Sequence, residues 1–159
     1  MTFYFFREDL TALEEQIKKL DTQRREWGKV MGEATRQSAE TFHDNFPFED
    51  ANRQFEMLSV RIHDLMAIKS CARLVDGSVA RTDRVSIGSL VTVEDKETRE
   101  LRQIRIGSYM VLTERGMDPV LTVSYSSPMA KLIMGARVGD VRQGKVGETM
   151  RQLQVERIE

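Results

Sequence analysis

Residues 10–41 read LTALEEQIKKLDTQRREWGKVMGEATRQSAET, and this stretch decides the fold. Apolar or small side chains recur along it in steps of three and four, at Leu10, Leu13, Ile17, Leu20, Trp27, Met31 and Ala34, with Arg24 at the seam position between Leu20 and Trp27. This heptad seam predicts one helix of roughly 48 Å at 1.5 Å per residue. No small globular domain wraps a helix of that length, so we expect most of it to pack on a partner helix.

A second stretch with the same seam follows directly in the sequence. Its seam residues are Phe48, Ala51, Phe55, Leu58, Ile62, Leu65 and Ala72. The connection, FHDNFP, is short, so the two helices are expected to lie antiparallel. Asp44 or Asn45 can cap the second helix, and Pro47 suits its first turn because its missing N–H needs no partner there. Residues 1–75 are therefore predicted to form an antiparallel coiled-coil hairpin with its tip at residues 42–50.

The pattern changes to a two-residue period after the hairpin. Four stretches alternate or cluster β-branched residues, namely VSIGSLVTV (85–93), LRQIRIGSYMVL (101–112), PVLTVSY (119–125) and RQLQVERI (151–158). One short helix, SPMAKLIMG, interrupts them, with Ser127 before Pro128 as its start and Gly135 as its stop. The chain is therefore predicted to be α+β, with a small β domain of residues 76–159 after the hairpin.

Composition narrows the classes of function. The 159 residues carry a net charge of −1, with 40% hydrophobic and 31% charged residues, so any electrostatic partner surface is local. The single cysteine, Cys71, excludes an internal disulfide and a thiolate zinc cage and fits a cytoplasmic setting; we expect it to be buried and inert.

The apolar start MTFYFF is too short for a signal peptide or a membrane span, so we expect it to pack on the domain and expect no membrane partner. The sequence contains no phosphate-cradling loop, nucleophile elbow or zinc motif, so no small-molecule substrate is expected.

Two stretches resemble the bacterial Gre transcript-cleavage factor family. Residues 124–140, SYSSPMAKLIMGARVGD, are similar to the family's signature of Ser-Pro, a small helix and then Gly-Asp. Residues 58–76, LSVRIHDLMAIKSCARLVD, are similar to the end of the family's second helical arm. The order of parts, a long hairpin followed by an FKBP-like β domain, is also similar and covers nearly the whole chain.

The resemblance implies a transcription elongation factor whose partner is RNA polymerase. In that family the β domain docks at the rim of the polymerase secondary channel, and the hairpin reaches towards the catalytic magnesium. Two acids at the tip help to hold a second magnesium and a water, so that the polymerase cleaves its own backtracked RNA. The chain is then no enzyme by itself and has no cofactor of its own, because it shares Mg with the polymerase.

The tip differs from the family's Gly-Asp-Leu-x-Glu-Asn-Ala, since residues 43–51 read HDNFPFEDA. An ungapped count from Arg61 places Asp44 on the family's Glu and loses the first acid. A match with two inserted residues places Asp44 on the family's Asp, Glu49 on its Glu and Asp50 on its Asn. Both alternatives stay open, and they make Asp44, Glu49 and Asp50 the candidate catalytic residues, with Asp44 and Glu49 as metal ligands. The structural alternative is that Asp44 only caps the second helix and that Glu49 and Asp50 only favour its dipole.

The sequence also predicts roles for residues of the β domain signature and for the phenylalanines of the tip. The candidate polymerase contacts in the β domain are the signature residues Tyr125, Ser127, Pro128 and Met129, whose first role is structural. At the tip, Phe48 is expected in the core, whereas Phe42 and Phe46 are expected to close the open end of the hairpin against each other.

Further functions stay open beside the leading one. A factor of the same shape that blocks the polymerase metal site is the nearest alternative, and a coiled-coil adaptor without a polymerase role is another. A peptidyl-prolyl isomerase is less favoured, because residues 76–159 contain only Tyr109 and Tyr125 as aromatic residues. Basic side chains on the first helix suit a salt-bridged solvent face, or contact with the phosphates of the nascent RNA 3′ end.

Overall fold

The contacts of the chain divide it into two compact units. The computed structural model describes residues 1–38, 46–75, 83–113 and 120–159. The hairpin unit comprises Met1 and Thr11–Ala72, and the β unit comprises Thr2–Leu10 and Arg73–Glu159. Residues 1–75 are predicted from the sequence to form the hairpin, whereas the contacts place Thr2–Leu10 in the β unit. The reason is that Phe5 is fully buried there and Asp9 is hydrogen-bonded to Ser108.

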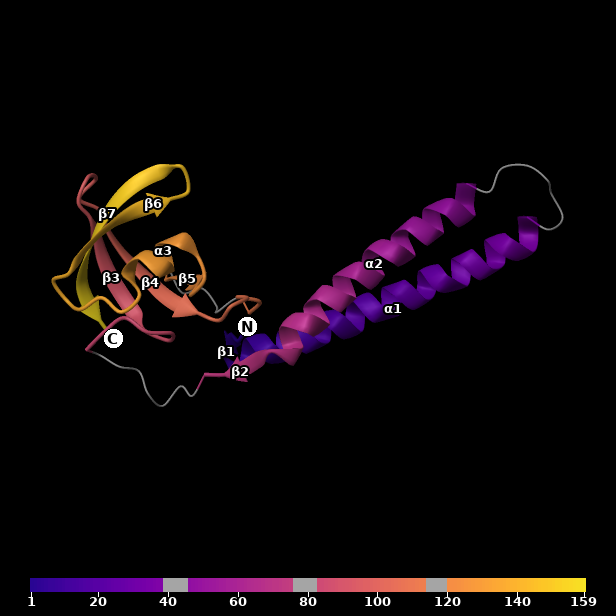
Figure 1. The fold of residues 1–159 in the computed structure, drawn as a ribbon, viewed down its shortest axis with the longest axis horizontal. Helices are drawn as coiled ribbons and strands as arrows, with labels where there is room; N and C mark the ends of the chain where they lie inside the picture. Colours follow the sequence, from indigo (N-terminus) through magenta and orange to yellow (C-terminus); the bar gives the residue numbers. More distant parts are fainter. Residues whose placement is uncertain (39–45, 76–82, 114–119) are drawn as a thin grey trace. The chain divides into compact units, whose positions relative to one another are not determined.

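Two long helices dominate the hairpin unit, α1 (Arg7–Ser38) and α2 (Phe46–Ser70) (Figure 1). Lys69 Nζ, late in α2, lies 2.9 Å from Glu14 Oε1, early in α1. Further along, the guanidinium carbon of Arg24 lies 5.6 Å from the centroid of the Phe55 ring. The two helices therefore run antiparallel, while the coiled-coil geometry of the pair stays a prediction.

The seam between α1 and α2 is only partly buried. Leu13, Ala51, Ile62 and Leu65 are buried. Other seam residues on the two helices are half-buried: Ile17, Leu20, Trp27, Met31, Ala34, Phe48, Phe55 and Leu58. Each helix covers one stripe of the other and no third element is described over this seam, so the hairpin unit has a narrow core.

A five-stranded, curled sheet forms the body of the β unit (Figure 1), with the order β5-β4-β3-β7-β6. Its strands are β3 (Leu90–Asp95), β4 (Leu101–Gly107), β5 (Leu121–Ser124), β6 (Val141–Val146) and β7 (Thr149–Ile158). The β4–β5 pair is parallel and the other neighbouring pairs are antiparallel. A register shift between Thr92 and Val93 interrupts the pairing of β3 with β7.

The short helix α3 (Pro128–Ile133) packs on this sheet (Figure 1). Its Ala130 and Ile133 are fully buried in one cluster with residues of the three strands β3, β4 and β7, among them Val91, Val93, Ile104, Ile106, Leu153 and Val155. The Ser127 hydroxyl accepts a hydrogen bond from the Ala130 N–H at 3.2 Å, and Gly135 follows the helix with φ +74°. The predicted start at Ser127 and stop at Gly135 are therefore confirmed.

A second, two-stranded sheet joins β1 (Phe3–Phe5) to β2 (Ala72–Leu74). The Val75 N–H donates to the Phe5 carbonyl at 2.8 Å, and the Tyr109 N–H donates to the Tyr4 carbonyl at 2.9 Å. The expected packing of the apolar start on the domain is thus confirmed. The FKBP-like character of the β unit stays a prediction.

Cys71 is exposed, so the prediction that it is buried is wrong. The physical reason is its position in a turn, directly after α2 ends at Ser70. Among the described helices, none combines the length and the apolar character needed to cross a membrane.

Candidate functional site

The first turns of α2 carry the described residues of the predicted tip. Phe46 begins the helix and is 66% exposed, whereas Phe48 is half-buried on the seam. Phe42 lies outside the described residues, so the expected closure of Phe42 against Phe46 stays a prediction. Within the described ranges, the Phe46 ring is an apolar side chain left largely in water.

Glu49 and Asp50 have different surroundings although they are neighbours in sequence. Glu49 is exposed, and its carboxylate has no hydrogen-bond or ion-pair partner among the residues that the structure describes. Asp50 is half-buried, and its Oδ1 accepts a hydrogen bond from Arg53 Nη2 at 2.5 Å. Asp44, the third candidate, lies outside the described residues. Glu49 can therefore take a cation directly, while Asp50 has first to release Arg53.

Helical geometry limits how these acids can act together. Successive residues of an α-helix point about 100° apart, so Glu49 and Asp50 do not face one point. Within residues 1–38, 46–75, 83–113 and 120–159, no three His, Cys, Asp or Glu side chains are grouped to hold a metal ion. A second ligand for an ion at Glu49 thus has to come from another part of the tip or from a partner, and not from Asp50.

Tyr125 lies in an aromatic cluster of the β unit. Its ring centroid is 6.1 Å from that of Tyr4 and 6.3 Å from that of Tyr109, and its hydroxyl accepts the Tyr4 N–H at 3.3 Å. Tyr109 in turn lies 4.3 Å from Phe3, centroid to centroid. These contacts attach β1 to the ends of β4 and β5, so part of the role of Tyr125 is structural.

Tyr125 also lines an open groove of about 700 Å³, which we call the Tyr125 groove. Apolar side chains from three segments line it, including Leu74, Val85, Ile87 and Met134, and Arg84 contributes a charge. Leu74 is 49% exposed and Tyr4 is 43% exposed. An open groove that keeps large apolar side chains in water is typical of a surface that binds a partner.

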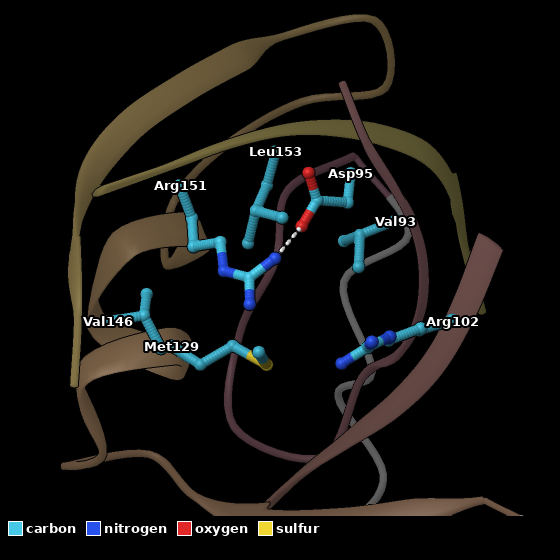
Figure 2. Close-up of a pocket in the computed structure, with 7 residues that line it drawn as sticks. All are labelled: Val93, Asp95, Arg102, Met129, Val146, Arg151 and Leu153. Atoms are coloured by element: carbon cyan, nitrogen blue, oxygen red, sulfur yellow. Dashed lines mark hydrogen bonds and ion pairs between the residues drawn. The ribbon is translucent and has the colours of Figure 1, made fainter. Parts of the chain in front are cut away.

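The other three predicted polymerase contacts lie in different surroundings. Ser127 uses its hydroxyl to cap α3, and Pro128 is exposed at the first position of that helix. Met129 is half-buried and lines a separate cavity of about 200 Å³ (Figure 2). The structure therefore brings Tyr125 and Met129 to two different hollows of the β unit.

The cavity beside Met129 is lined by paired charges (Figure 2). Arg151 Nη1 lies 2.7 Å from Asp95 Oδ2, as the dashed line in Figure 2 marks. Arg102, which also lines the cavity, is paired with Glu100 outside the lining, with Nη2 2.6 Å from Glu100 Oε2. Burial raises the pKa of Asp95, but hydrogen bonds from the Glu97 N–H and from Arg151 lower it more, so the pKa lies below its ordinary value of 3.8. Asp95 is thus an ionised structural carboxylate at neutral pH, unsuited to accept or donate a proton in catalysis.

Asp9 is a buried carboxylate that the sequence analysis did not single out. It is 2% exposed, and its Oδ2 accepts the Ser108 hydroxyl at 2.5 Å. Its Oδ1 accepts the Leu112 N–H at 2.9 Å, the Thr113 N–H at 3.1 Å and the Thr113 hydroxyl at 2.9 Å. Burial raises the pKa of Asp9, but the hydrogen bonds from Ser108, Leu112 and Thr113 lower it to below the ordinary 3.8. Asp9 therefore attaches the first turn of α1 to the segment after β4, and its role is structural.

Comparison with known proteins gives a consistent result. The family described as transcription elongation factor, GreA/GreB, C-term, matches residues 80–159. Transcription elongation factor GreA of Syntrophomonas wolfei is 32% identical over 136 residues, which cover 83% of this chain and 80% of the relative. GreA of Alkaliphilus oremlandii is 28% identical over 152 residues, which cover 94% of this chain and 91% of the relative.

Among solved structures, GreA factor homolog 1 (Gfh1) of Thermus thermophilus aligns with a TM-score of 0.46 and 22% identity, covering 100% of this chain and 99% of that one. The match over residues 80–159 and the 32% identity across most of the chain both relate this chain to the same family. The chain therefore belongs to the GreA/GreB family of transcription elongation factors.

Proposed function

We propose that the chain binds RNA polymerase through its secondary channel and stimulates cleavage of backtracked RNA. Family membership supports the class of partner, because the relatives are named transcription elongation factors. The mechanism rests on one observation. The Glu49 carboxylate is exposed, and among the described residues it is unpartnered, in the first turn of α2 at the connection end of the hairpin.

In this mechanism Glu49 and Asp44 place carboxylate oxygens beside the metal site of the polymerase, and the chain needs no cofactor of its own. Carboxylate oxygens are the ligands that Mg²⁺ prefers, and a second ion there would help to stabilise the attacking and leaving oxygens of phosphodiester cleavage. In this proposal Asp50 does not share the role, since its side chain leaves the helix about 100° around the axis from that of Glu49 and binds Arg53.

The two helices give the reach that this mechanism needs. Helix α1 has 32 residues and α2 has 25, which correspond to about 48 Å and 38 Å at 1.5 Å per residue. A pair of helices is narrow, because each needs only one apolar stripe to pack on the other. The exposed Lys18, Lys19 and Lys29 on α1 would contact phosphates of the nascent RNA 3′ end.

The β unit is proposed to dock at the rim of the channel. The Tyr125 groove offers apolar surface for this contact, and the exposed Pro128 offers a rigid ring beside α3. Ser127 and Met129 then act indirectly, Ser127 by capping α3 and Met129 by packing α3 against the core cluster of the β unit. An FKBP-like fold of this unit belongs to the same proposal.

A second candidate function is inhibition of the polymerase through the same channel. The observation that favours it is the ion pair between Asp50 and Arg53, which neutralises one of the two described tip acids. With fewer free carboxylates, the tip could occupy the metal site without supplying a complete ligand set.

Cleavage of RNA in backtracked polymerase complexes separates the two functions. The unaltered chain should accelerate cleavage, and Glu49→Ala and Asp44→Ala should each lower the stimulated rate at least about tenfold, on the scale of a lost metal ligand. The matched control is Glu26→Ala, which removes an exposed acid from the middle of α1 and should leave the rate unchanged.

Binding to core polymerase is measured in parallel, so that loss of cleavage is not mistaken for loss of binding. An unaltered chain that binds and slows RNA synthesis without stimulating cleavage would overturn the cleavage proposal and leave the inhibitor. A chain that fails to bind core polymerase would overturn both.

A further inference from the structure

One side of α2 exposes apolar side chains outside the seam with α1. Met57 is 60% exposed and Val60 is 62% exposed, although both are large and apolar. They lie in a surface depression of about 510 Å³ with four charged residues, Arg53, Glu56, Arg61 and Asp64. We call these six residues the α2 face.

The α2 face has a symmetrical arrangement of charge. Each of its residues lies three or four positions from at least one other, as in Arg53–Met57, Glu56–Val60 and Arg61–Asp64, so the six share one side of the helix over about three turns. They also fall in pairs at equal distances from the midpoint between Leu58 and Ser59, as Met57 with Val60, Glu56 with Arg61, and Arg53 with Asp64. The two outer pairs each combine one acid with one base, and the inner pair is apolar.

This arrangement fits a second copy of the same chain. A two-fold axis at the midpoint would set two α2 helices antiparallel, with Met57 of one copy against Val60 of the other. Arg53 of each copy would then face Asp64 of the other, and Glu56 would face Arg61. Two-fold symmetry repeats each contact, so the interface would contain four pairs of opposite charge and none of like charge.

We propose that the α2 face is a self-association surface on which two copies of the chain pair antiparallel. Its two acids and two bases sum to zero charge, so the face suits neither a nucleic acid nor a uniformly acidic or basic protein. The bonds that it makes within the chain are weak competitors. They are the Arg53–Asp50 pair, the Glu56–Asn52 hydrogen bond at 3.3 Å and the Asp64–His63 contact at 3.8 Å, all on exposed or half-exposed side chains.

The size of the face sets the strength of the association. Three helical turns per copy bury less than the roughly 1,200–2,000 Å² of a stable interface, so the dimer is expected to be weak, with a Kd on the order of 100 µM. On the function proposed above, the dimer would cover hairpin surface that a channel has to admit, so self-association and polymerase binding would compete. The self-association itself does not depend on that function.

Sedimentation of the full chain from about 5 µM to about 1 mM tests the proposal directly. The weight-average mass should rise from 18.3 kDa towards twice that value. Arg53→Glu and Asp64→Arg should each weaken the dimer at least about tenfold, because each places like charges opposite one another twice. The matched control is Lys19→Glu, a charge change on α1 outside the face, which should leave the association unchanged.

An equal mixture of Arg53→Glu and Asp64→Arg provides the sharpest outcome. In the mixed dimer the new acid at position 53 faces the new base at position 64, and the native Arg53–Asp64 pair forms on the other side. The mixture should therefore recover the association of the unaltered chain while each variant alone does not, which also excludes misfolding as the cause. A chain that stays at 18.3 kDa at about 1 mM, or a mixture that fails to recover association, would overturn the proposal.

Discussion

The hairpin unit and the β unit differ in what they bury. In the β unit, eleven buried apolar residues form one cluster, and the buried carboxylate of Asp9 accepts four hydrogen bonds. In the described part of the hairpin unit, four apolar residues are buried: Leu13, Ala51, Ile62 and Leu65. The hairpin instead exposes the Glu49 carboxylate and the α2 face. The buried packing that stabilises this chain is therefore concentrated in the β unit, whereas the hairpin unit carries the exposed groups that are proposed to bind a metal ion or a second copy of the chain.

Replacing one isoleucine by alanine in each unit should give the largest difference in the free energy of unfolding. Ile106 is fully buried in the β unit, and Ile17 is half-buried on the hairpin seam. Ile106→Ala should lower the free energy of unfolding by about 4 kcal/mol, because it leaves a cavity in a closed cluster, and Ile17→Ala by about 1–2 kcal/mol. Urea unfolding followed by circular dichroism measures both, and fluorescence of the single Trp27 follows the hairpin unit. Equal losses for the two variants would contradict the comparison.

The buried carboxylate should give the next largest effect. Asp9→Ala leaves the Ser108 hydroxyl and the N–H groups of Leu112 and Thr113 without their acceptor, so we expect a loss of about 3 kcal/mol in unfolding free energy. The control is Glu8→Ala, which removes an exposed acid from the same helical turn and should change the stability by no more than about 0.5 kcal/mol. A loss below about 1 kcal/mol for Asp9→Ala would mean that these donors find other partners.

Acid should destabilise the β unit through the same group. The pKa of Asp9 and that of Asp95 are lowered in the folded chain, below 3.8. Such groups contribute stability that is fully present above the unfolded pKa and is lost as the pH falls through the lower folded pKa. Unfolding free energies should therefore be flat from pH 7 to about 5 and fall steeply below about pH 4. Asp9→Asn should fall less steeply in that acid range, and a slope equal to that of the unaltered chain would argue that other carboxylates cause the acid sensitivity.

The elements predicted correctly from the sequence are those that local chemistry determines. The seam spacing predicts α1 and α2 because an apolar stripe recurs within each turn, and Ser127, Pro128 and Gly135 predict α3 because the cap, first turn and stop act within a few residues. The seam residue Phe48 shows the limit of this reasoning. It lies on the predicted stripe, yet it is only half-buried because two helices cover each other incompletely.

What the sequence did not predict depends on contacts between distant residues. Asp9 gains its partners from residues 99 to 104 positions away, and the three-residue strand β1 packs on residues more than 100 positions further along. A periodic pattern in the sequence does not predict contacts between residues that lie so far apart in the chain. Strand β6, VRQGKV, was missed because its exposed positions carry charged and polar side chains and give a weak alternation. At the tip, the sequence could name Glu49 and Asp50 but not the ion pair to Arg53 that separates them.

Glu49 should show the smallest effect on stability and a large effect on function. Glu49→Gln keeps the size of the side chain and removes its charge. If the acid only favours the dipole of α2, the hairpin loses about 0.3–1 kcal/mol and stimulated cleavage is unchanged. A loss that small leaves the hairpin almost fully folded, so a tenfold or greater fall in cleavage cannot come from unfolding. If binding to core polymerase is also unchanged, the fall is assigned to the lost metal ligand. The matched control is Asp50→Asn, which removes the charge of the neighbouring acid that is already paired with Arg53. This substitution should lower the free energy of unfolding by no more than about 0.5 kcal/mol and leave stimulated cleavage unchanged. Equal losses of cleavage from both substitutions would mean that the two acids act as a pair and that the Arg53 contact opens at the polymerase.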